Sequence, residues 1–170
     1  KAMNIDKLGD KIIEQLIDSG LVSKFSDIYK LEAEQLLKLE RQGKKSVDNL
    51  LSSIEKSKKS ELNRFIYSLG IRFVGEQTAK SLAQNFGSID ALLNASEEDL
   101  LAIDDIGPKV AQSVIEAIHQ DEFVKEVREL LKMGIVFKEI KEKASAKFAD
   151  LTFVITGTLA VPRNEIKDFI

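Results

Sequence analysis

Four glycines recur along the chain with basic side chains beside them, and turns of this kind can bind an anion. Gly9, Gly43, Gly75 and Gly107 are separated by 34, 32 and 32 residues. A glycine placed directly before a helix leaves free backbone N–H groups and the positive end of the helix dipole open to a ligand. Such a site binds phosphate without a charged side chain, and a phosphate contact does not read the bases. The glycines therefore predict sequence-independent contacts to a nucleic-acid backbone.

The four turns differ in charge, and this difference ranks them as phosphate sites. Arg41, Lys44 and Lys45 make the second turn the most basic, so it is the strongest candidate. The fourth turn carries Asp104 and Asp105 at its tip, and these carboxylates repel phosphate. We therefore expect this turn to be mainly structural, although the positive charge of Lys109 offsets part of the repulsion. The residues predicted to contact DNA are Lys7, Gly9, Lys11, Arg41, Gly43, Lys44, Lys45, Arg72, Gly75, Thr78, Gly107 and Lys109.

The apolar spacing around each glycine predicts the elements that hold the turns. An aliphatic residue stands four positions before each glycine, and apolar residues stand four, seven and eight positions after it. This spacing marks one face of a helix. We expect glycine at the turn because it accepts φ > 0 and a close backbone approach. Helical patterns over residues 32–37, 61–69 and 96–101 precede the later turns, so the repeated unit is helix, hairpin turn, helix.

The remaining segments and aromatic residues predict packing rather than chemistry. Short helices are expected at residues 25–29 and 89–93, and a last helix at 123–133. Phe65, Phe73 and Phe86 are expected in the core rather than as stacking platforms for bases. His119, the only histidine, falls near a helix end and has no evident catalytic partner. The acidic pair of the fourth turn is interpreted as a solvated turn, because no further metal ligands cluster with it.

The composition limits the possible functions of the 170 residues. Hydrophobic residues make up 44% and charged residues 31%, which favours a soluble helical protein. The net charge of -3 excludes binding of nucleic acid by bulk positive charge. Residues 1–60 carry +2, residues 61–120 carry -5 and the rest is neutral, so any anion site must be local. The absence of cysteine excludes disulfides, cysteine zinc sites and thiol chemistry. We also find no apolar run of membrane-spanning length, and the start of the chain does not resemble a signal peptide.

Several stretches resemble one family. AMNIDKLG (2–9), LGIRFVG (69–75) and IGPKVA (106–111) resemble the tandem helix-hairpin-helix domain of bacterial NAD-dependent DNA ligases. FVITGTL (153–159), with Arg163 and Glu165, resembles the opening of the BRCT domain that follows in this family. The resemblance covers nearly the whole chain in the right order. One departure concerns the residue two positions before each repeat glycine, where the family usually has glycine and often has histidine in the third turn. Those residues here are Lys7, Arg41, Phe73 and Asp105.

The resemblance implies a part of an enzyme rather than a complete one. In such ligases a lysine is adenylated from NAD, AMP passes to the 5′-phosphate of a nick, and the 3′-hydroxyl attacks. The Lys-x-Asp-Gly adenylation motif and the four-cysteine zinc module are absent from this chain. We therefore expect no catalytic residue and no activity in this fragment alone, with NAD, Mg and Zn bound only by other parts of the parent. The implied partners are nicked double-stranded DNA and other domains of the same ligase, and no membrane contact is expected. The resemblance also implies a monomer that is located in the bacterial cytoplasm and associated with the nucleoid.

The expected fold class is all-α, with four tandem helix-hairpin-helix repeats followed by a truncated α/β start of a BRCT domain. We place the helix-hairpin-helix domain at 1–137, a charged linker at 138–150 and the incomplete BRCT start at 151–170. A buried strand at 151–156 and a helix from residue 163 are too little to fold independently. One alternative function stays open, a helical protein-interaction scaffold without DNA contact. A third hypothesis, a stand-alone enzyme, is disfavoured because the adenylation motif and the four-cysteine zinc module are missing.

Overall fold

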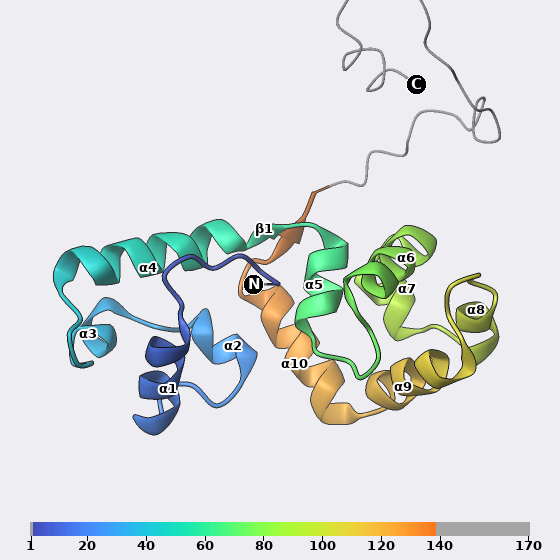
Figure 1. Cartoon of the computed structure of the whole chain (residues 1–170), viewed down its shortest axis with the longest axis horizontal. Helices are drawn as coiled ribbons and strands as arrows, with labels where there is room; N and C mark the ends of the chain where they lie inside the picture. The colour runs from blue at the N-terminus through green and yellow to red at the C-terminus, as the bar shows by residue number, and fades with distance from the viewer. Residues whose placement is uncertain (1, 139–170) are drawn as a thin grey trace, which may run out of the picture. The chain divides into compact units, whose positions relative to one another are not determined.

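The computed structural model describes residues 2–138, and this part of the chain is built from short helices, as the fold class predicted (Figure 1). The predicted BRCT start and all but the first residue of the predicted linker lie outside it, so these two domain assignments stay predictions. Within residues 2–138, no helix combines the length and the apolar composition that a membrane span requires. In chain order the elements are α1 (Asp10–Asp18), α2 (Phe25–Ile28), α3 (Ala33–Leu36), α4 (Lys44–Ser57), β1 (Lys59–Ser60), α5 (Leu62–Ser68), α6 (Glu76–Phe86), α7 (Ile89–Leu93), α8 (Glu97–Leu101), α9 (Pro108–Ile118), α10 (Asp121–Lys132) and β2 (Val136–Phe137).

Most of the repeated apolar positions form the core, which confirms most of the predicted helix faces. Ile17, eight residues after the first glycine, is 55% exposed, so the prediction was wrong at this position. Around α1, α3 and α4 the buried cluster includes Leu16, Leu36 and Leu50. A larger cluster joins α5 to α10 and includes the fully buried Leu82 and Val114, which stand seven residues after the third and fourth glycines. Each repeat thus buries most of the apolar face of the helix that follows its turn, and the four repeat glycines lie at the surface.

Among the elements of residues 2–138, a two-residue strand pair is the one that was not predicted from the sequence. β1 and β2 pair in parallel, with Lys59 opposite Val136. The N–H of Val136 donates to the carbonyl of Lys58 at 2.8 Å, and the N–H of Lys138 donates to that of Ser60 at 3.0 Å. Two residues are too few to show the alternation by which a strand is recognised. The pair ties the α4–α5 junction to the segment after α10.

Carboxylates of α10 fix this helix to α2, about one hundred positions earlier in the chain. The backbone N–H and the hydroxyl of Ser26 donate to the two oxygens of Glu126 at 2.7 and 3.0 Å. Lys30 donates to Glu129 at 2.9 Å, and this hydrogen bond lowers the pKa of Glu129. Ser26 is buried, so its two donors need the partners that Glu126 provides.

Two other carboxylates cap short helices and make stability depend on pH. The backbone N–H of Ser23 is the main cause that lowers the pKa of Asp27, and the Ser96 hydroxyl lowers that of Asp99. A carboxylate whose pKa is lower in the folded chain stabilises the fold above its unfolded pKa and loses this contribution as the pH falls. We expect the free energy of unfolding to decrease as the pH drops below the ordinary value of 3.8. Urea denaturation at a series of pH values measures this. The Asp27→Asn, Asp99→Asn double variant should show a shallower decrease, and an unchanged slope would contradict the assignment.

Candidate nucleic-acid interface

Each repeat glycine is the residue from which a long helix starts. Gly9, Gly43, Gly75 and Gly107 are the N-caps of α1, α4, α6 and α9, which have 9, 14, 11 and 11 residues. The carbonyl of each glycine accepts a hydrogen bond from the residue four positions later, at 2.9 to 3.1 Å. No side chain caps any of these four helices. The sequence therefore builds four uncapped helix starts of the same local form.

The open helix starts leave backbone donors without protein acceptors. At the second turn the N–H groups of Gly43, Lys44 and Lys45 make no hydrogen bond within residues 2–138. The same holds for the two residues after Gly9 and Gly75. In the fourth turn Pro108 occupies the first helical position, so one of these donors is missing there. The first three turns therefore offer more free N–H groups than the fourth.

The backbone at these glycines differs from the prediction. Their φ values lie between -102 and -84°, in the extended region that any residue adopts. The expectation that glycine provides φ > 0 here was wrong. A Cβ built on any of the four meets no atom within 4 Å, so the glycines leave open space before the helix starts. Close approach by an outside group remains the reason for a glycine that the structure supports.

The positive φ occurs two residues earlier, at the position where the resembling family usually has glycine. Lys7, Arg41 and Phe73 have φ of 69, 59 and 65°. L-residues adopt this region at a cost of roughly 1 kcal/mol, because Cβ crowds the following carbonyl. Asp105, the matching residue of the fourth turn, is not among the residues with positive φ in the described part. The fourth turn therefore differs in backbone shape as well as in charge.

The basic side chains predicted to contact DNA are at the surface and available. Within the described residues, the ion pairs involve Lys30, Lys58 and Arg128 and none of the predicted contact residues. Thr78 is half-buried on α6, behind the third turn. The second turn brings together three exposed cations and free N–H groups around one glycine. The exposed cations of the predicted site are Lys7, Lys11, Arg41, Lys44, Lys45, Arg72 and Lys109.

The acidic tip of the fourth turn has an internal partner. The Ser81 hydroxyl on α6 donates to the Asp105 carboxylate at 2.6 Å. Ser81 is buried, so this bond connects the fourth turn to the helix of the third repeat. No group of three or more histidine, cysteine or carboxylate side chains gathers as a metal site within residues 2–138. The contact is consistent with a mainly structural role for this turn.

The third turn and the start of α9 border a common hollow of about 550 Å³. Arg72 and Phe73 line it from the third turn, and its lining from α9 includes Lys109, Gln112 and the acidic Glu116. Phe73 is 53% exposed, so the prediction that it belongs to the core was wrong. The reason is its position in the turn, two residues before the glycine, outside the buried helix faces.

The other two aromatic predictions are closer to the structure. Phe65 on α5 is fully buried, and Phe86 at the end of α6 is half-buried against the core. His119 is exposed at the end of α9, with Nδ1 2.9 Å from the carbonyl oxygen of Ile115. No acidic or nucleophilic side chain is bonded to this ring in the described part of the chain.

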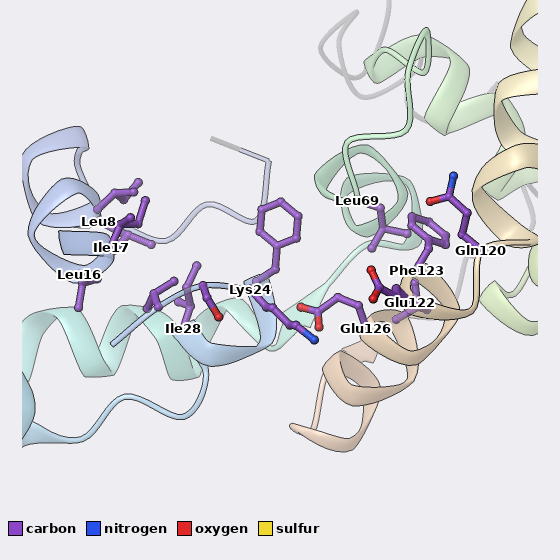
Figure 2. A pocket seen from close by; sticks show the side chains of 15 residues that line it. Leu8, Leu16, Ile17, Lys24, Ile28, Leu69, Gln120, Glu122, Phe123 and Glu126 are labelled. Carbon is purple, nitrogen blue, oxygen red and sulfur yellow. The ribbon is translucent and has the colours of Figure 1, made fainter. Parts of the chain in front are cut away.

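A second hollow, of about 590 Å³, lies among α1, α2 and α10 and was not predicted (Figure 2). Leu16 and Ile17 line it from α1, and Phe123 and Glu126 from α10. Its lining is mostly apolar, and it lacks the cluster of cations found at the second turn. It could not be predicted from the sequence, because segments about one hundred residues apart form its walls.

Comparison with known proteins places this arrangement in a family. Residues 2–56 match the family described as SAM-like helix-hairpin-helix tandem, and residues 64–127 match the helix-hairpin-helix motif. A DNA ligase of Bdellovibrio bacteriovorus is 49% identical over the whole chain. DNA ligases of Koribacter versatilis and Bacillus subtilis are 46 and 45% identical over 99 and 98% of it. The chain spans about a quarter of the length of these relatives, 25, 25 and 26% respectively. Over nearly its whole length the chain therefore matches one part of these DNA ligases, and its described part is a tandem of helix-hairpin-helix units.

Proposed function

We propose that residues 2–138 hold duplex DNA through the hairpin backbones, as the DNA-holding part of an NAD-dependent DNA ligase that seals nicks. The observation that carries this proposal is the repeated, uncapped helix start with free N–H groups and exposed cations beside it. Phosphate oxygens accept hydrogen bonds from such N–H groups and are attracted by the helix dipole. The match to DNA ligases supports DNA as the polyanion.

The geometry also explains how a chain with a net charge of -3 binds a polyanion. Attraction comes from local sites, and the second turn is the strongest because Arg41, Lys44 and Lys45 surround Gly43. Two neighbouring turns can hold the two strands on either side of a minor groove. Contacts to phosphates carry no base information, so we expect binding to be independent of sequence.

The finer parts of the proposal rest on the resemblance. The nicked duplex is the expected DNA form, and the other domains of the same ligase are the expected protein partners of a monomeric chain in the bacterial cytoplasm. Adenylation from NAD, with Mg and Zn, is assigned to the parts of the parent that lie beyond this chain. This fragment is proposed to position the duplex and to perform no chemical step.

Salt dependence tests the phosphate contacts directly. We expect fluorescence anisotropy with a labelled duplex to show weaker binding as salt rises, with the same affinity for unrelated sequences. Lys44→Gln and Lys45→Gln should each reduce the slope of log affinity against log salt by roughly one. Lys109→Gln is the matched control, and its effect should be smaller because the acidic tip of the fourth turn already opposes phosphate.

The outcome that contradicts the proposal is a folded Lys44→Gln, Lys45→Gln variant with the affinity and slope of the parent chain. Circular dichroism verifies the folding of each variant. In that case the second candidate, a scaffold that contacts other proteins, becomes the better one. The apolar hollow among α1, α2 and α10 is the observation that favours this second candidate.

A further inference from the structure

The third turn exposes an aromatic ring to which neither the core nor the phosphate contacts assign a role. Phe73 is 53% exposed, so its ring does not gain the full free energy of burying apolar surface. Its φ of 65° also places the backbone in a region that costs free energy. A phenyl ring cannot bind phosphate. The guanidinium carbon of Arg72 lies 4.8 Å from the ring centroid, which fixes a cation beside an apolar surface.

The surroundings of the ring indicate what it meets when DNA is bound. Phe73 is two residues from Gly75, whose helix start offers free N–H groups. It also borders the hollow that Lys109, at the start of α9, lines from the other side. Because Phe73 lies two residues before the start of α6, a duplex whose phosphate reaches that helix start would place the adjoining groove beside the ring. The minor groove, about 6 Å wide, is the groove that two adjacent turns can bracket.

We propose that Phe73 enters the minor groove as an apolar wedge and inserts partly between neighbouring base pairs. This inference rests on the proposed function and adds a specificity to it. Apolar wedges unstack base steps at a cost of a few kcal/mol and bend the duplex. That cost is smallest where one strand is interrupted, because the stack is already weakened. Phe73 therefore gives the third turn a preference for nicked over intact duplex.

The wedge differs from the phosphate contacts in its response to salt. Removing a cation lowers the salt slope, because fewer counterions are released on binding. Removing an apolar ring lowers affinity and leaves the slope unchanged. Phe73→Ala should therefore weaken binding to nicked duplex by at least about fivefold at every salt concentration. It should also reduce the ratio of affinities for nicked and intact duplex.

The experiment compares the 170-residue chain with Phe73→Ala, Phe73→Leu and Lys44→Gln. Anisotropy over a salt series gives affinities for nicked and intact duplexes of one sequence. A 2-aminopurine base beside the nick reports unstacking as increased fluorescence when the parent chain binds. We expect Phe73→Leu to retain most of this signal and Phe73→Ala to lose it. Phe73→Gly, which the positive φ accommodates, replaces the alanine variant if that variant does not fold.

The possible failures can be distinguished. If Phe73→Ala keeps the affinity, the nick preference and the 2-aminopurine signal of the parent while Lys44→Gln weakens binding, the wedge is wrong and the phosphate contacts stand. If the parent itself shows no salt-dependent binding, the proposed function fails and the wedge fails with it. A reduced salt slope in Phe73→Ala would also overturn the wedge, because it would show an electrostatic effect.

Discussion

Replacing Gly43 with aspartate is expected to weaken DNA binding by roughly tenfold or more while leaving the helices folded. The backbone at this position, with φ of -102° and ψ of 164°, suits any residue, and a Cβ there meets nothing within 4 Å. Aspartate is a favourable N-cap, so its carboxylate would accept hydrogen bonds from the free N–H groups at the start of α4. It would occupy the donors that phosphate needs and would place a negative charge at the site.

Two companion variants separate the causes of this loss. Gly43→Asn caps the helix without adding charge, and Gly43→Val blocks close approach without capping. Both should weaken binding less than aspartate does, and thermal unfolding should show that all three variants are folded. Gly107→Asp is the matched control, because Pro108 already removes one donor there, and its effect should be small. Parent-like affinity in folded Gly43→Asp would show that the second turn does not hold phosphate.

The sequence was sufficient to predict the helices and their buried faces. Leu16, Leu50 and Leu82 share one spacing from their glycines, and all three are fully buried. This success has a simple physical reason. Burial of one helix face depends on periodicity, which is written in the order of apolar residues. The short helices α7 and α8 also lie close to the predicted ranges 89–93 and 96–101, and in the structure the side chains of Ser88 and Ser96 cap their starts.

Backbone dihedrals at the turns were not predictable in the same way. Glycine marked the turn correctly, but its negative φ shows that the turn does not use the conformational freedom of glycine at this position. The left-handed residues are Lys7, Arg41 and Phe73, and side-chain type alone gives no sign of this. Their conformation is imposed by the geometry of the hairpin. The available signal was the resemblance to a family that usually has glycine at these positions, because glycine commonly adopts a positive φ.

Contacts between distant segments were also beyond the sequence. Ser26 bonds to Glu126, and Ser81 bonds to Asp105, across separations of 100 and 24 residues. A polar residue on a helix surface has many possible partners, and the sequence does not select one. For this reason the structural role of the acidic fourth turn stays a prediction from its charge, while its bond to α6 appeared only in the structure.

Replacing Phe65 with alanine is expected to lower the free energy of unfolding by about 3–5 kcal/mol. The ring is fully buried on α5, and its centroid lies 5.1 Å from that of Phe137 on β2. Alanine would leave a cavity that the surrounding helices fill only in part. The loss is a large share of the roughly 5–15 kcal/mol that stabilises an ordinary domain. Urea denaturation monitored by circular dichroism measures it.

Phe73→Ala provides the matched control, because the same atoms are removed from an exposed ring in the neighbouring turn. Its effect on unfolding should stay within about 0.5 kcal/mol, as for other surface substitutions. The two variants should therefore separate stability from binding. Phe65→Ala should destabilise the fold, whereas Phe73→Ala should retain it and bind nicked DNA poorly. A small effect of Phe65→Ala on unfolding would show that α5 and β2 are not joined through this ring. A large effect of Phe73→Ala would assign the exposed ring to the fold instead of to the ligand.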